Sequence, residues 1–149
     1  ILGSQAGNGN DLDISQVGTG QYASIVQGGS NNEIALVQLS LLNDAFLTQN
    51  GTGNLIDLLQ NGTANTSTVN QLGTNNDALI SQSGGSNSVL INQSGNSGLI
   101  DILQSTSGAY AEVNQSGGNS NRTFVTQASL DAVAIVTQTG ANNYASVNQ

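Results

Sequence analysis

The sequence predicts an all-β fold, a parallel β-solenoid of about seven two-strand rungs whose two parallel sheets face each other. Three observations support this prediction. Glutamine recurs at every eleventh position, an alternating apolar pattern precedes each glutamine, and small polar residues follow it. Each eleven-residue unit therefore holds one strand and one arc. Two consecutive units return the chain above its start and complete one rung of twice that length.

The repeat is marked by fourteen glutamines, and the spacing between them is constant except for one interval that is longer by a single residue. A short period that covers the whole chain indicates stacked copies of one supersecondary unit. The extra residue falls between Gln115 and Gln127, and we expect it to bulge an arc without reversing the next strand, since Val125 keeps its inward parity. The glutamines are Gln5, Gln16, Gln27, Gln38, Gln49, Gln60, Gln71, Gln82, Gln93, Gln104, Gln115, Gln127, Gln138 and Gln149.

The strand of each unit has one inward face. Positions are counted from the glutamine at position 0, and the extra residue of the longer unit is placed in its turn, before Asn121. Positions 5, 7, 9 and 11 then alternate along an extended segment. Position 9 is aliphatic in all thirteen units, and position 7 is mostly small or aliphatic. Position 5 is asparagine in nine units. These asparagines are Asn10, Asn32, Asn43, Asn54, Asn65, Asn76, Asn87, Asn121 and Asn143.

The arcs are expected at positions 1 to 4, which are rich in Gly, Ser, Asn and Thr. Six or seven strand residues would then alternate with four turn residues in each unit. Glycine fills position 2 in ten of the thirteen units. The predicted turn glycines are Gly7, Gly18, Gly29, Gly51, Gly62, Gly73, Gly84, Gly95, Gly117 and Gly140.

The inward amides are expected to form ladders, in which each Asn or Gln side chain hydrogen-bonds the same side chain one rung above and below. A buried amide without a partner costs about 1–3 kcal/mol, so such ladders would fix the register of the stack. Strands that pair at about 4.8 Å per rung make a stack only about 30 Å tall.

The acidic residues support this assignment of inward and outward positions. Eight of the nine occupy outward positions 6 or 8, and the ninth, Asp131, lies in a turn. A buried unpaired carboxylate would be costly. Along alternate units, four carboxylates switch between positions 6 and 8 on successive rungs, which reduces repulsion between them. These four are Glu33, Asp57, Asp77 and Asp101. Asp11 lies directly above Glu33 and breaks the stagger.

The composition limits the classes of function. The chain lacks Cys, Pro, Met, Trp and His, and Arg122 is its only basic residue. A net charge of −8 disfavours binding to nucleic acid, and no apolar run approaches membrane-spanning length. The missing methionine indicates a processed or trimmed chain. We predict no catalytic, metal-binding or cofactor-binding residue, and residues 1–149 read as a single repeat domain.

Two units carry a specific motif. The unit from Gln71 to Gln82 reads Q-x-G-x-x-N-x-A-x-x-x-Q, and the unit from Gln138 to Gln149 repeats it in full. This pattern resembles the curlin repeat, the building block of bacterial curli fibres, and the resemblance covers essentially the whole chain. Asn65 and Ala132 depart from it, because the usual curlin repeat has Ser at that place.

The resemblance implies a secreted subunit that folds as a β-solenoid while it polymerises into extracellular cross-β amyloid of a biofilm matrix, with a role in adhesion. It also implies two partners besides the chain itself, a nucleating curlin and an outer-membrane secretion channel. It implies neither insertion into a membrane nor binding of nucleic acid.

The sequence also predicts self-assembly on physical grounds. Repeat proteins that stay monomeric cap their ends, and soluble sheets protect their edges with Pro, Lys or bulges. This chain has no Pro and no Lys, and its ladder residues reach both ends of the sequence. We therefore expect an open head-to-tail homopolymer that joins the ends marked by Gln5, Gln16, Gln138 and Gln149.

The repeat is also compatible with two other classes of function. A monomeric β-solenoid that binds a surface, ice or carbohydrate is the alternative, although ice binding would require repeated threonine on one face, and outward positions 6, 8 and 10 are heterogeneous. A polysaccharide-acting enzyme is disfavoured, because His and Cys are absent and a two-sheet rung is too narrow for a cleft. Tyr22 and Tyr110 share one outer position and are candidates for lateral contacts between filaments.

Overall fold

The computed structural model describes residues 1–149 and contains fourteen β-strands and no helix, so no helical segment could cross a membrane. The strands form two parallel sheets of seven strands each. The odd sheet holds β1 (Leu2–Asn8), β3 (Tyr22–Ser30), β5 (Asp44–Thr52), β7 (Thr66–Thr74), β9 (Ser88–Asn96), β11 (Tyr110–Ser116) and β13 (Val133–Thr139). The even sheet holds β2 (Asp11–Thr19), β4 (Glu33–Leu41), β6 (Leu55–Thr63), β8 (Asp77–Gly85), β10 (Leu99–Gln104), β12 (Arg122–Gln127) and β14 (Tyr144–Asn148).

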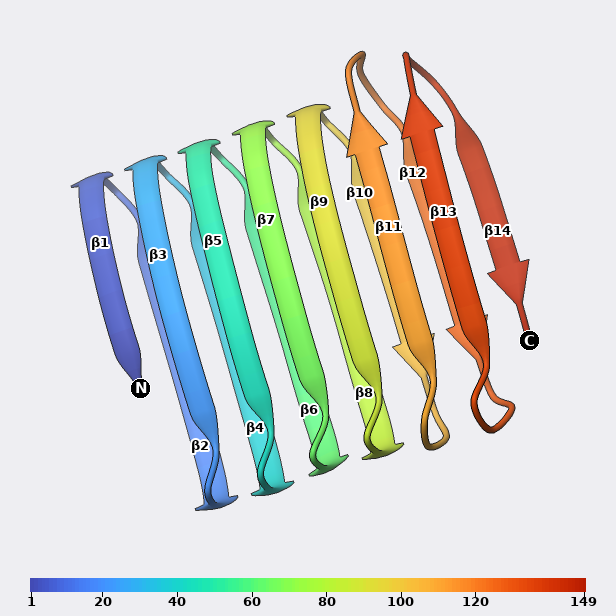
Figure 1. Ribbon diagram of the computed structural model, residues 1–149. Helices are drawn as coiled ribbons and strands as arrows, with labels where there is room; N and C mark the ends of the chain where they lie inside the picture. Colours follow the sequence, from blue (N-terminus) through green and yellow to red (C-terminus); the bar gives the residue numbers. More distant parts are fainter.

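Consecutive strands lie in opposite sheets, so one odd and one even strand make a rung (Figure 1). Each strand pairs in register with the strands one rung away; Val69 of β7, for example, pairs with Leu47 of β5 and Ile91 of β9. The N-terminus lies at one end of the stack and the C-terminus at the other (Figure 1). The predicted parallel β-solenoid of seven rungs, with 22 residues per rung, is confirmed.

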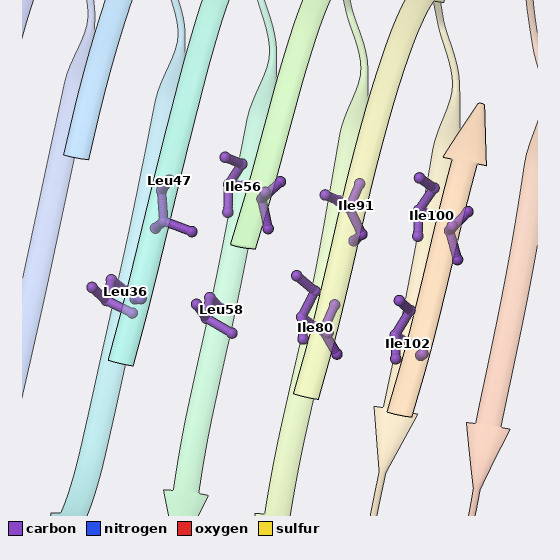
Figure 2. Close-up of a cluster of buried hydrophobic side chains, with 14 of the residues drawn as sticks. Leu36, Leu47, Ile56, Leu58, Ile80, Ile91, Ile100 and Ile102 are labelled. Carbon is purple, nitrogen blue, oxygen red and sulfur yellow. The ribbon is translucent and has the colours of Figure 1, made fainter. Parts of the chain in front are cut away.

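The core is a thin layer between the sheets. Side chains at positions 7 and 9 meet there, including Leu47, Ile56, Leu58 and Ile91 (Figure 2). Of the 42 buried residues, 20 are polar, and all 20 are Gln, Asn, Ser or Thr. An interior that is almost half polar is stable only if its polar groups are hydrogen-bonded. No Asp or Glu is buried.

The strands are longer than the sequence predicts. Strands β2 to β9 have nine residues each, and they continue through the glutamine and position 2, which is Ser40 in β4 and glycine in the other seven, into the arc. The expected boundary, a turn that begins right after the glutamine, is wrong because the arcs of successive rungs also stack and keep their backbone hydrogen bonds, as between Gly53 and Ser30 at 3.0 Å. Of the ten predicted turn glycines, eight lie inside strands, while Gly117 and Gly140 follow β11 and β13.

Both conformation and space favour glycine at position 2, although Ser40 also adopts a positive φ there. Gly51, for example, has a φ of 140°, and a Cβ atom there would lie 1.9 Å from the carbonyl oxygen of Gly73 in the next rung. Because no side chain fits at that distance, the stacked glycines allow neighbouring arcs to approach each other closely.

A second left-handed residue occurs at position 4 of the arcs, and the sequence did not reveal it. Asn and Gly tolerate this conformation, but Leu42 and Ala64 also adopt it, each with a φ of 57°. A β-carbon in the left-handed region costs roughly 1–2 kcal/mol. These arcs are therefore held in place by the stacking of the strands on either side of them.

The extra residue of the longer unit is accommodated in the arc between β11 and β12. Gly117 and Gly118 both have positive φ values there, and β12 resumes the original register, with Val125 opposite Ile102 and Gln127 opposite Gln104. Val125 and Gln127 remain buried. The prediction that the extra residue bulges an arc without reversing the strand is confirmed.

We predict that Ala64→Gly stabilises the folded chain by about 1 kcal/mol, because glycine removes the strain of a left-handed β-carbon. Urea-induced unfolding measures this change. Ala35→Gly is the matched control, since Ala35 lies within β4, and it should destabilise the chain by about 0.5–1 kcal/mol. Equal effects of the two substitutions would contradict the assignment of strain to the arc.

Candidate functional site

The inner glutamines form two continuous ladders, one in each sheet, along the axis of the stack. In each step, Nε2 of one glutamine donates to Oε1 of the glutamine one rung nearer the C-terminus, at 3.0 Å from Gln27 to Gln49 and 2.9 Å from Gln49 to Gln71. Six such bonds join the seven glutamines of the odd sheet. Six more join the seven of the even sheet. Every predicted ladder glutamine therefore takes part.

The same amide also ties the two sheets together. Nε2 carries two hydrogens, and the second is donated to a backbone carbonyl of the opposite sheet, as from Gln71 to Leu55 and from Gln127 to Tyr110, both at 2.9 Å. Gln71 has no exposed surface. Both hydrogen bonds of the glutamine amide form only when the next rung and the opposite sheet are in register. The amide therefore fixes the register between rungs and the register between the two sheets.

The asparagines at position 5 are stacked, but their bonds differ from the ladder expected from the sequence. The Oδ1 atom of Asn54 accepts the backbone N–H of Asn76 in the next rung, at 3.0 Å. The side-chain amide of Asn76 donates to the carbonyl oxygens of Leu72 and Gly95 in two successive arcs, at 3.1 and 3.0 Å. The expected amide-to-amide ladder is present only from Asn10 to Asn54: Nδ2 of Asn32 donates to Oδ1 of Asn10 at 3.3 Å, and Nδ2 of Asn54 donates to Oδ1 of Asn32 at 3.2 Å. Beyond Asn54 the expectation is wrong, because the shorter asparagine side chain reaches the backbone of the arc instead and holds the bend.

Four units lack asparagine at this position, and the structure shows what each loses. Gln21 donates to the carbonyl oxygens of Val17 and Ser40 as an asparagine would, but its buried Oε1 has no hydrogen-bond partner. Gly98, Ala109 and Ala132 have no polar side chain to accept the next rung's N–H. Three of these four interruptions fall after residue 97, so the C-terminal part of the asparagine columns is the less continuous part.

Two buried hydroxyl groups join the glutamine ladders, and the sequence analysis missed them. The Ser67 hydroxyl donates to Oε1 of Gln82 at 2.7 Å across the core. Thr123 does the same to Gln138 at 3.0 Å, and it accepts from Gln115 at 3.0 Å. The available signal was a hydroxyl residue at position 7, where the other units have Ala, Val, Ile or Leu.

The ends of the stack expose the edges of both sheets. β1 and β2 are the outermost strands at one end, and β13 and β14 at the other. The predicted end residues lie there: Gln5 on β1, Gln16 on β2, Gln138 on β13, and Gln149 directly after β14. The Nε2 groups of Gln5 and Gln16 donate into the ladder, and no group donates to their Oε1 atoms. Gln138 and Gln149 donate only across the core, to Arg122 and Val133.

The outward carboxylates of the even sheet are staggered as their sequence positions require. Asp57 pairs with Ala35 and Leu79, and Asp77 pairs with Leu55 and Leu99, so none of these pairs joins two carboxylates. Asp11 and Glu33 do lie directly opposite each other. Partial burial raises the pKa of Asp77 above its usual value, which means that its charged form is disfavoured in the folded chain.

The geometry defines the class of protein. Two amide ladders with open ends run the whole length of the stack, which is the construction of a structural repeat protein. The sequence model of the curlin associated repeat matches residues 7–39, 43–73, 51–84 and 73–105, more than half of the 149 residues. The chain therefore belongs to the curlin repeat family, a family of structural proteins and not of enzymes. Comparison with curated proteins and with solved structures found no similar chain.

We predict that Gln71→Lys destabilises the fold by roughly 3 kcal/mol or more, because an ammonium group would be buried without a counter-charge. Urea-induced unfolding measures the loss. Leu72→Lys introduces the same charge one residue away on an exposed side chain and should have little effect. Similar stability of the Gln71→Lys variant and the unmodified chain would contradict the role of the ladder.

We predict that Asp77→Asn stabilises the folded chain at neutral pH. The raised pKa means that the folded state binds the proton more tightly than the unfolded state. The stability of the unmodified chain therefore falls as pH rises from the ordinary Asp value of 3.8 through the raised pKa, and the advantage of the variant disappears below pH 3.8. Unfolding curves between acidic and neutral pH measure this, with Asp131→Asn in an exposed arc as the control. A constant difference across the pH range would contradict it.

Proposed function

We propose that the chain is a structural subunit of an extracellular, curli-like amyloid fibre that assembles head to tail through the open ends of the solenoid. The observation that carries the proposal is the pair of unpaired sheet edges at each end of the stack, in register with glutamine ladders that can continue. An edge strand with free N–H and C=O groups is a template for another strand.

The two ends are complementary to each other and not to themselves. At the β1–β2 end, Oε1 atoms of Gln5 and Gln16 are available as acceptors. At the β13–β14 end, the amide groups of Gln138 and Gln149 each keep one hydrogen for a further donor bond. A second copy stacked head to tail would extend both ladders. Contacts of this heterologous kind give an open filament when the rotation does not close a ring.

The backbone arrangement supports a cross-β fibre. Strands of every rung lie perpendicular to the direction in which copies would stack, and identical amides already follow each other along that direction. Membership of the curlin repeat family supports the same conclusion. The fibre would serve as biofilm matrix and in adhesion, with a nucleating curlin and an outer-membrane secretion channel as the partners in its assembly.

The test is to transfer denatured 149-residue chain into buffer and to follow thioflavin T fluorescence, with fibre diffraction on the product. We expect spontaneous growth and a meridional reflection at about 4.8 Å. Preformed fibres should shorten the lag phase, whereas the Gln71→Lys variant should grow far more slowly under the same conditions. A folded chain that stays monomeric at high concentration would contradict the proposal and would favour a monomeric binding module.

A further inference from the structure

The two outer faces of the solenoid differ in charge. Strands of the even sheet carry six of the nine carboxylates, which are Asp11, Asp13, Glu33, Asp57, Asp77 and Asp101. Strands of the odd sheet carry only Asp44 and Glu112. Two even faces brought together would place rows of like charge opposite each other, whereas two odd faces would not.

The odd sheet also exposes more apolar surface in proportion to its charge. Of the fifteen large hydrophobic side chains that are exposed, seven belong to strands of the odd sheet and five to strands of the even sheet. On the odd sheet they include Phe46, Leu72 and Ile135, and the rings of Tyr22 and Phe46 lie 5.6 Å apart. An exposed apolar face with little charge is typical of an interaction surface.

A third ladder lies on the outside of the odd sheet. Asn70 donates to Asn92, and Asn92 donates to Asn114, both at 3.0 Å. Asn114 donates to Glu112 at 2.8 Å, and Tyr110 donates to the other oxygen of the same carboxylate at 2.8 Å. These two hydrogen bonds, that from Asn114 first, lower the pKa of Glu112. Both oxygens of the Glu112 carboxylate are therefore hydrogen-bonded to residues of the same sheet face.

A shallow groove of about 330 Å³ runs beside this outer ladder. Asn70, Asn92 and Asn114 line one side of it, and Leu72, Ser94 and Ser116 line the other. The groove follows the stack axis across β7, β9 and β11, so its features repeat once per rung. Another copy of the chain has the same spacing of about 4.8 Å between rungs, so its ridges would match the groove along these three rungs of each copy.

We propose that the outer face of the odd sheet is the lateral contact between two filaments of this chain, and that the carboxylates of the even sheet keep the opposite face free. The inference rests on the proposed function, since it concerns filaments. Paired sheets that carry outward amide ladders pack as dry, interdigitated interfaces, and such packing requires matched spacing and low charge. The outer face of the odd sheet has both the matched spacing and the low charge, whereas the outer face of the even sheet has the spacing but carries six carboxylates.

The test places two new carboxylates on one face or on the other. Thr48→Glu with Thr137→Glu charges the odd face, and Ser81→Glu with Thr126→Glu charges the even face. All four residues occupy position 10 of their units, and none is paired with an acidic residue in the strands beside it. Both variants therefore gain the same charge in comparable surroundings.

Thioflavin T fluorescence measures growth, and electron microscopy with mass per length measures lateral association. We expect the even-face variant to form paired filaments like the unmodified chain. We expect the odd-face variant to grow at a similar rate but to lose its pairs, so that mass per length falls to that of a single stack. High salt should restore pairing, because added salt screens exposed charges.

Three results would overturn the inference. Filaments of the unmodified chain that never pair, pairing that survives charges on the odd face, or pairing lost only from the even-face variant would each refute the lateral contact and leave the fibre proposal intact. A chain that forms no filaments at all would refute the proposed function, and this inference with it.

Discussion

The structure depends on one amide group that makes two obligatory bonds. Each inner glutamine donates one hydrogen to the next glutamine of its ladder in all but the last rung, and another to a carbonyl oxygen across the core in all but the first rung. The apolar layer alone could not set the register, because Val, Ile and Leu side chains pack acceptably at several offsets. The amide cannot slip, since a shift of one residue would point it to the solvent and leave buried carbonyls without a donor.

The remaining features follow from keeping these amides aligned. Glycine at position 2 lets successive arcs approach closely, asparagine at position 5 holds the bend, and carboxylates stay outside, where they are staggered between rungs. Where the pattern weakens, the structure adapts locally. The extra residue of the longer unit is accommodated in a glycine-containing arc, and Ser67 and Thr123 replace an apolar contact with a hydroxyl that joins the ladder.

Much of the fold was accessible from the sequence because position in the repeat determines environment. The eleven-residue period and the aliphatic position 9 were sufficient to predict the rungs, the residues that point inward, and the pairing of β7 with β5 and β9. Bonding details were not accessible. Asparagine and glutamine differ by one methylene, and only the geometry of the arc shows that asparagine reaches the backbone. The left-handed backbone of Leu42 and Ala64 left no trace in residue type, since stacking imposes it.

The one-way order of the ladders has an electrical consequence. A β-sheet ordinarily has almost no net dipole, because the dipoles of its strands largely cancel. Here twelve side-chain amides point in one direction along the stack, with oxygens towards the β1–β2 end and hydrogens towards the β13–β14 end. Their dipoles add as peptide dipoles do in an α-helix. Each solenoid therefore has a partly negative end and a partly positive end, and any stack of copies in one orientation would be an electrically polar rod.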